Sequence, residues 1–449
     1  MKKERLFTNR QLLTLLWPLI IEQALEILVG MADTVMVSSV GEAAISGVSL
    51  VDMINQLIIT LFGALATGGA VVTSQHLGAK RPEDAAKSAG QLVGLSAILG
   101  VGVAAFCLIT RTAQLRLFFG TISDEVMQAC LTYFTITALS FPFLALYNAG
   151  AAIFRSTGNS AVSMKVSVIV NAINFCGNAL CVFVLKMGVA GVAVPTLISR
   201  AVGACIILAL AARQDYQLRI TPQSVTRLEG RTVKSILYIG IPSAFENSLF
   251  QLGRVLVVSM ISLFGTVHIS ANAVANNLDA IGCIVGNAMG LAMITVIGRC
   301  VGAQDFEQTK YYTKKLLLWD YIAQGAVNVV VLAMLNQILS MYTLTPETRA
   351  LAWTLVMIHN GCAILLWPAS FVLPNALRAA NDVRFTMVVA TVSMLVWRMG
   401  LSWVLCVQMG MGAVGVWYAM VVDWVCRIIC FAARFVSGAW EKNAVKKAA

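Results

Sequence analysis

Apolar segments of membrane-spanning length recur along this chain from residue 12 to residue 436. A helix needs about 20 apolar residues to cross the roughly 30 Å hydrocarbon core of a bilayer. Only 12% of the 449 residues are charged, about half the roughly 25% of a soluble domain, which excludes an ordinary water-soluble enzyme. The sequence therefore predicts an all-α polytopic membrane protein with twelve spans, at residues 12–37, 46–74, 88–110, 125–149, 161–185, 189–212, 235–264, 269–297, 316–340, 349–374, 385–408 and 412–436.

The distribution of basic residues orients these spans. Residues 213–234 form the longest polar stretch and are predicted to be a cytoplasmic linker between an N-lobe (1–212) and a C-lobe (235–449), each with six spans. Of the 32 Lys and Arg, 24 lie at the termini, in the connections on one side or at the adjoining span ends, and four lie on the other side. Because cytoplasmic loops carry the excess of basic residues, both termini are expected in the cytoplasm, with the protein in the inner membrane. The net charge of +11 thus reflects topology, and we expect no nucleic-acid partner.

The second half of the chain repeats the first at an offset of about 224 residues. Pro18 and Glu22 return as Pro242 and Glu246. Further matches include Gly41 with Gly265, Gly78-Ala79 with Gly302-Ala303, and Arg155-x-x-Gly158 with Arg378-x-x-Asn381. Six spans per half is an even number, so the halves are parallel repeats, an arrangement that suits alternating access between two lobes.

Three acidic residues lie on one face of the first predicted span. Glu22, Glu26 and Asp33 fall at about 0°, 40° and 20° when successive residues are separated by about 100°. A charged side chain at the bilayer centre costs at least about 2.5–3.5 kcal/mol, so such residues are functional candidates. The alternative is neutralisation by an interior arginine such as Arg200.

Other charged residues lie in the second half. Glu246 is the repeat equivalent of Glu22, and Arg254 follows two turns later, where it could neutralise an acid or repel cations. Three further acids are expected near helix ends, where water would hydrate them: Asp279, Asp320 and Asp423.

Two amides in the fifth span share a helix face. Asn174 and Asn178 are four residues apart, and Thr196 is a polar residue of the sixth span. Amides within spans often serve helix packing. Beside a first-span carboxylate, however, two amide oxygens and a hydroxyl would supply hard ligands for a small cation such as Na⁺.

The 11 cysteines form no C-x-x-C pair, and no His-rich cluster accompanies them. We therefore expect buried thiols, with no structural metal, disulfide framework or cofactor.

The chain resembles the multidrug and toxic compound extrusion (MATE) family, of the NorM- and DinF-like bacterial type. The resemblance rests on the six-plus-six spans, on Pro18 followed by Ala32-Asp33-Thr34, on Gly78-Ala79, on the Arg155-x-x-Gly158-Asn159-Ser160 loop and on Asn174-x-x-x-Asn178. It implies two six-helix bundles arranged in a V around a central cavity. It also implies secondary transport: export of small cationic, amphipathic compounds in exchange for H⁺ or Na⁺.

The resemblance also implies site residues. Asp33 falls where members carry the aspartate central to coupling, and Asn174 and Thr196 match positions that complete a cation site in some members. Asn178 resembles members with an amide in place of a second aspartate. In the C-lobe, Glu246 lies about one turn before the family's seventh-span glutamate and Gln251 lies nearer its place, while the tenth span contains no acid. We therefore assign Asp33, Asn174, Asn178 and Thr196 to ion coupling, and assign to the substrate cavity Glu22, Glu26, Glu246, Gln251 and Arg254.

Several alternatives remain at this stage. A lipid-linked oligosaccharide flippase of the same superfamily would need a cavity lined by Arg and Lys, against the acidic face of the first span. A non-transporting membrane scaffold would tolerate neutral residues along that face. An intramembrane enzyme is disfavoured because H-E-x-x-H and G-x-S-x-G are both absent. The pseudo-symmetric halves favour a monomer, and the coupling ion stays open between H⁺ and Na⁺.

Overall fold

The described part of the chain is helical throughout. A computed structural model describes residues 5–120, 122–213 and 218–448, and among these there is no β-strand. The chain divides into two compact units, one of residues 7–244 and one of residues 245–449 together with 1–6. Lys2 and Lys3, which contribute to the predicted charge asymmetry, lie outside the described residues.

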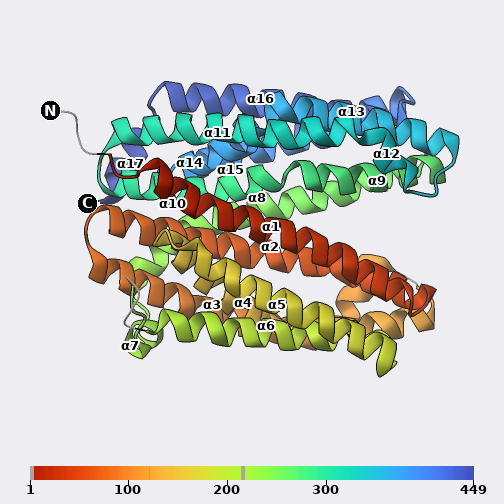
Figure 1. Ribbon diagram of the computed structural model, residues 1–449, viewed down its shortest axis with the longest axis horizontal. Helices are drawn as coiled ribbons and strands as arrows, with labels where there is room; N and C mark the ends of the chain where they lie inside the picture. The colour runs from red at the N-terminus through yellow and green to blue at the C-terminus, as the bar shows by residue number, and fades with distance from the viewer. Residues whose placement is uncertain (1–4, 121, 214–217, 449) are drawn as a thin grey trace. The chain divides into compact units, whose positions relative to one another are not determined.

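The first unit contains the six spans predicted for the N-lobe. Its helices run lengthwise beside one another (Figure 1), with α4 packed against α2, α3 and α6, and α5 packed against α1 and α6. The bounds are α1 (Asn9–Ser38), α2 (Glu42–Gly78), α3 (Pro82–Phe119), α4 (Asp124–Ser156), α5 (Ser160–Ala179) continued by the π-helical segment η1 (Leu180–Val184), α6 (Ala190–Ala211) and the short α7 (Pro222–Thr226).

The second unit begins inside α8 (Gly230–Ser262). In this unit α13 packs against α9, α11 and α16, and α10 against α11 and α14. The bounds are α9 (Thr266–Gly282), α10 (Ile284–Gly302), α11 (Phe306–Ala333), α12 (Leu335–Ser340), α13 (Pro346–Trp367), η2 (Pro368–Val372), α14 (Leu373–Ala379), α15 (Val383–Ser393), η3 (Met394–Leu401), η4 (Trp403–Gln408), α16 (Gly412–Val436) and α17 (Glu441–Ala448).

The backbone repeats as the sequence does. Left-handed residues, which require positive φ, recur at the repeat offset in the turns between helices. The pairs are Gly41 with Gly265, Lys80 with Gln304, Gly158 with Asn381, Lys186 with Gly410, and Gly188 with Gly412. Because positive φ is unfavourable for residues other than glycine, its recurrence at Lys80 and Gln304 shows that the two halves form the same turns.

Two helices of the second half are broken where the sequence predicted continuous spans. The predicted span 269–297 is divided at Cys283 into α9 and α10, and the predicted span 316–340 at Met334 into α11 and α12. Their counterparts in the first half, α2 and α3, are single helices. Neither break coincides with a proline, although the first directly follows Gly282, whose repeat equivalent in α2 is Ile58. At Cys283 the side chain of Asn328 donates to the carbonyl of Gly282 at 3.0 Å, so a side chain inserted from α11 stabilises the break.

Ten described segments are long and apolar enough to cross a membrane by length and composition. They account for ten of the twelve predicted spans. The other two predicted spans are the long helices α8 and α16, which carry charged residues near their middles: Glu246 and Arg254 in α8, and Asp423 and Arg427 in α16.

The start of α8 packs within the first unit. Gly68 of α2 lies so close to the backbone of Ile236 and Gly240 that a methyl group in its place would overlap the Ile236 carbonyl oxygen. Because of this contact, the first unit extends to Ala244 and does not end at residue 235, the predicted start of the C-lobe. Residues 222–226 and 230–234 of the predicted linker are helical, and residues 214–217 lie outside the described residues.

Candidate functional site

The four predicted ion-coupling residues lie together in the first unit. Asn178 Nδ2 donates to Asp33 Oδ1 at 2.7 Å and to Asn174 Oδ1 at 3.2 Å. Asn174 Nδ2 in turn donates to Thr196 Oγ1 at 3.0 Å. The network joins α1, α5 and α6 through side chains alone. Asn178 is fully buried and its Oδ1 has no hydrogen-bond partner, so one amide oxygen beside Asp33 is free to accept.

A second polar group lies within electrostatic range of Asp33. Asp52 of α2 accepts hydrogen bonds from Asn55 Nδ2 and Tyr133 Oη, both at 3.1 Å. Arg200 of α6 donates to Ser140 Oγ at 2.7 Å. Asp52 was not among the predicted site residues, because only the packing of α2 against α4 brings it to Tyr133.

Glu22 is neutralised by an arginine other than Arg200. Its Oε1 lies 3.6 Å from Arg155 Nη1, and its Oε2 accepts from Ser163 Oγ at 3.0 Å. Glu22 is 8% exposed, so it is held in a packed environment between α1, α4 and α5. The proposed alternative of neutralisation by an interior arginine thus applies to Glu22, with Arg155 as its partner. Glu26, one turn later, is exposed and accepts from Gln23 Nε2 at 3.3 Å.

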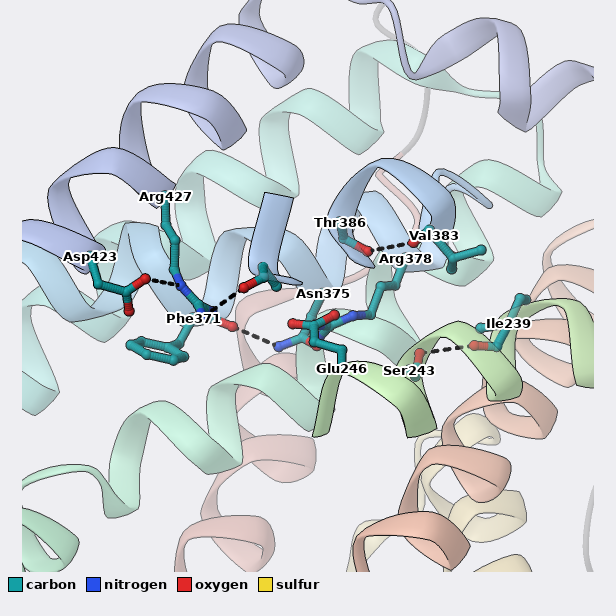
Figure 2. Close-up of polar contacts among 11 residues, drawn as sticks. Ile239, Ser243, Glu246, Phe371, Asn375, Arg378, Val383, Thr386, Asp423 and Arg427 are labelled. Carbon is teal, nitrogen blue, oxygen red and sulfur yellow. Dashed lines mark hydrogen bonds and ion pairs between the residues drawn. The ribbon is translucent and has the colours of Figure 1, made fainter. Parts of the chain in front are cut away.

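The second unit contains the repeat equivalent of that ion pair. Arg378 Nη2 donates to Glu246 Oε1 at 2.6 Å, and Arg378 Nη1 donates to Asn375 Oδ1, also at 2.6 Å. Figure 2 shows these three side chains together. Glu246 and Arg378 correspond to Glu22 and Arg155 in the repeat. Each half therefore has a glutamate four residues after a proline, paired with an arginine at the end of the fourth membrane-spanning segment of its half.

The Glu246–Arg378 pair lines a cavity of about 180 Å³ in this unit. Arg427 also lines it, with its guanidinium 5.4 Å from the centre of the Phe371 ring (Figure 2). Arg427 Nε donates to Asp423 Oδ1 at 3.1 Å, and Ser393 Oγ also hydrogen-bonds that carboxylate. Each arginine of this cavity is therefore paired with a carboxylate, which leaves a polar but neutralised wall beside aromatic surface.

The structure does not bring the other two predicted cavity residues of the second unit to this cavity. Gln251 is half-buried and Arg254 is exposed, and neither is among the residues that line the cavity beside Glu246. Arg254 lies within electrostatic range of Asp279.

A further cluster joins α9 and α13. Asp279 Oδ1 lies 2.6 Å from His359 Nε2 and accepts from Cys283 Sγ at 3.2 Å. The ligand atoms of these three residues all lie within 4.8 Å of one another. Sequence reasoning missed this convergence because the histidine is far along the chain from the other two. All eleven cysteines are free thiols.

The expected positions of two acids near helix ends are wrong. Asp320 lies in the middle of α11 and Asp423 in the middle of α16, and they are 0% and 1% exposed. Hydropathy alone could not show how deep these acids lie in their helices, because a single acid barely changes the mean hydropathy of a long apolar segment.

Repeated helical bundles with charged side chains buried inside membrane-spanning segments are typical of polytopic membrane transporters. Residues 18–180 and 242–404, the two repeats, each match the model of the MatE family. The chain belongs to this family.

Individual relatives agree over nearly the whole length. The chain is 28% identical over 431 residues to the "Uncharacterized transporter YisQ" of Bacillus subtilis, covering 94% of this chain and 92% of the relative. It is 24% identical to the "Probable multidrug resistance protein NorM" of Thermotoga maritima, covering 97% and 94%. Among solved structures, an outward-facing multidrug resistance MATE family transporter of the MOP superfamily has a TM-score of 0.89 at 20% identity, with 97% and 96% of the two chains covered. At this level of sequence identity, the structural similarity shows that the two proteins share a fold.

Proposed function

We propose that this protein is a secondary active antiporter that exports cationic, amphipathic compounds in exchange for H⁺ or Na⁺ by alternating access, with Asp33 as the coupling residue. The relatives named multidrug resistance proteins support the export of drug-like molecules.

The observation that carries the proposal is the hydrogen bond from Asn178 Nδ2 to Asp33 Oδ1 at 2.7 Å. It attaches α1 to α5 at a position where the carboxylate can change its charge. The unpartnered Asn178 Oδ1 would face a bound Na⁺ as a ligand or a protonated carboxyl group as an acceptor. Either ligand would neutralise Asp33.

Neutralising Asp33 weakens the attachment of α1. A hydrogen bond to a charged group contributes about 1.5–3 kcal/mol and one between neutral groups about 0.5–1.5 kcal/mol. The difference, about 1 kcal/mol, corresponds to about a fivefold change in the equilibrium between two conformations. Pro18 lies inside α1 and removes one backbone hydrogen bond, so the helix can bend there. Ion binding from outside would thus favour one arrangement of α1 and release of the substrate outward.

The charges of the candidate sites favour cationic substrates over phosphate-bearing lipids. Glu26 is exposed, and Asp33 is half-buried. In the second unit, Arg378 and Arg427 are paired with Glu246 and Asp423. A flippase for lipid-linked oligosaccharides would need arginines free to bind phosphate, so we place this function second.

The remaining features of the proposal concern location and assembly. The excess of basic residues at the termini and alternate connections supports cytoplasmic termini in an inner membrane. The pseudo-symmetric halves support a monomer as the transporting species.

The experiment is transport of ethidium in proteoliposomes containing the purified protein, with pH and Na⁺ gradients imposed separately. We expect one of the two gradients to drive accumulation of the dye. If neither gradient moves ethidium and a fluorescent lipid-linked sugar is translocated instead, the antiport proposal is wrong and the flippase takes its place.

A further inference from the structure

A row of buried polar residues follows one face of α11 in the second unit. Asp320, Gln324 and Asn328 are four residues apart, so they lie on neighbouring turns of the same face. All three are 0% exposed. A helix that only packs against its neighbours in a membrane has no need of three such residues in succession.

The side chains of Asp320 and Gln324 have no hydrogen-bond partner among the residues that the structure describes. Neither carboxylate oxygen of Asp320 accepts a hydrogen bond, and neither the Oε1 nor the Nε2 of Gln324 makes one. A buried carboxylate without a partner is among the most unfavourable arrangements in a protein interior, and native structures leave few buried polar atoms unpaired. The Asp320 oxygens therefore require a ligand, a bound water or a proton, and the Gln324 amide requires a ligand or a bound water.

Asn328 has a different and structural role. Its Nδ2 donates to the carbonyls of Gly282 at 3.0 Å and of Gln324 at 2.9 Å. The first of these bonds stabilises the break between α9 and α10. Asn328 thus places the row of polar residues beside the break between α9 and α10. In membrane transporters, ion sites commonly form at broken helices.

Glycine at position 286 makes room for the amide of Gln324. A methyl group on Gly286 would lie 2.1 Å from Gln324 Oε1 and 2.0 Å from the Trp367 ring. The bare backbone of α10 therefore allows the amide oxygen to fit between α10, α11 and the end of α13. Any larger residue at position 286 would fill the space that the Gln324 amide occupies.

The row belongs to the second half alone. At the repeat offset of 224, its three positions correspond to Ser96, Gly100 and Ala104 of α3. The first half folds with Ser96 and Gly100 in the places of Asp320 and Gln324, so the repeated architecture does not require a carboxylate and an amide there.

The unpartnered oxygen atoms indicate which kind of ligand would bind here. Carboxylate, amide and hydroxyl oxygens are hard donors that suit alkali and alkaline-earth cations. The single carboxylate supplies one negative charge, which balances a monovalent cation and would leave a divalent one with an uncompensated buried charge. Ser370 of η2, which packs against α10 and α11, adds a fully buried hydroxyl without a partner. It also lines the cavity beside Glu246.

We propose that Asp320 and Gln324, with the hydroxyl of Ser370, form a binding site for a monovalent cation of the size of Na⁺ inside the second unit. This site is separate from Asp33 and does not depend on the coupling role proposed for that residue.

The test is Na⁺-dependent stability of the purified full-length protein in detergent. The Asp33→Asn variant removes any Na⁺ effect from the first unit. Its unfolding midpoint is followed while choline chloride is replaced by NaCl at constant ionic strength, since a ligand that binds only the folded state raises the midpoint. We expect Na⁺ to stabilise Asp33→Asn, and the added substitution Asp320→Asn to abolish the effect.

A second variant covers the case in which Asp320→Asn fails to fold. Gln324→Met keeps the side-chain volume but removes the oxygen, and should raise the Na⁺ concentration for half-maximal stabilisation by at least about tenfold. The matched control is Glu307→Gln, which removes an exposed carboxylate from the first turn of the same helix and should leave the Na⁺ response unchanged.

Three results would overturn the proposal. The first is that Na⁺ does not stabilise Asp33→Asn, which would mean that Asp320 is simply protonated. The second is that Na⁺ stabilises the protein fully in the presence of Asp320→Asn or Gln324→Met. The third is that Glu307→Gln loses the Na⁺ response to the same extent as the site variants. Because stability is measured without transport, failure here leaves the antiport proposal standing, and loss of drug transport in Asp33→Asn leaves this site standing.

Discussion

The two repeat-related ion pairs should differ in their contributions to stability, although their sequence context is the same. Glu246 Oε1 lies 2.6 Å from Arg378, whereas Glu22 Oε1 lies 3.6 Å from Arg155. With an effective dielectric constant of about 20, Coulomb's law gives an attraction of about 6 kcal/mol for the first distance and about 5 kcal/mol for the second. All four side chains are 11–14% exposed, so solvent screening is weak in both pairs.

The perturbation is Glu246→Gln, which leaves Arg378 charged and buried. Arg378 Nε already lacks a partner, and only the hydrogen bond to Asn375 would remain of the two contacts described above. Breaking a buried pair from one side costs about 3–5 kcal/mol. We expect Glu246→Gln to lower the free energy of unfolding by about that amount, and Glu22→Gln by about 1–2 kcal/mol less, given the longer distance.

The assay is equilibrium unfolding in detergent, read by tryptophan fluorescence. The control is Glu229→Gln, because the Lys87–Glu229 pair is about half exposed and its loss should not change the unfolding transition. The double variant Glu246→Met with Arg378→Met removes both charges and should recover most of the lost stability. Equal effects of Glu246→Gln and Glu22→Gln, or a neutral Glu246→Gln, would refute the reasoning.

The remaining predictions concern the packing of the first unit. Gly68→Ala should destabilise the protein by about 1–3 kcal/mol, since the new methyl group would overlap the Ile236 carbonyl. Gly63→Ala in the same helix meets open space and should be neutral or stabilising by up to about 1 kcal/mol in the same unfolding assay; a reversed order would contradict the contact. Gln91 donates to the carbonyls of Ser224 and Arg227 and accepts from the Glu229 amide, so Gln91→Leu should increase proteolytic cleavage between residues 222 and 229, and an unchanged digestion pattern would count against this anchoring.

The sequence predicted the helical spans and one cluster of polar side chains well, because both depend on periodic features. The i, i+4 spacing of Asn174 and Asn178 puts them on one helix face, and the structure brings Asp33 and Thr196 to that face as expected. The repeat likewise predicted that Glu246 is equivalent to Glu22.

Other features depend on packing that no local pattern encodes. Arg155 and Arg378 were recognised as repeat equivalents, but their pairing with Glu22 and Glu246 required two helices to be placed side by side. The break at Cys283 is stabilised by a side chain from α11, so it could not be predicted from α9 and α10. Asp320 was expected near a helix end, because hydropathy does not show how far a residue lies from the ends of its helix. Its burial depends on the packing of the neighbouring helices.

The measurement that tests the central claim most directly is gradient-driven ethidium transport by Asp33→Asn beside the wild type, in proteoliposomes with matched protein content. The account predicts that the wild type accumulates the dye against its concentration gradient under one ion gradient, and that Asp33→Asn, which retains an amide able to pair with Asn178 but cannot change its charge, loses this accumulation while remaining folded. Accumulation by Asp33→Asn at the wild-type rate would show that the coupling ion acts elsewhere and would contradict the mechanism.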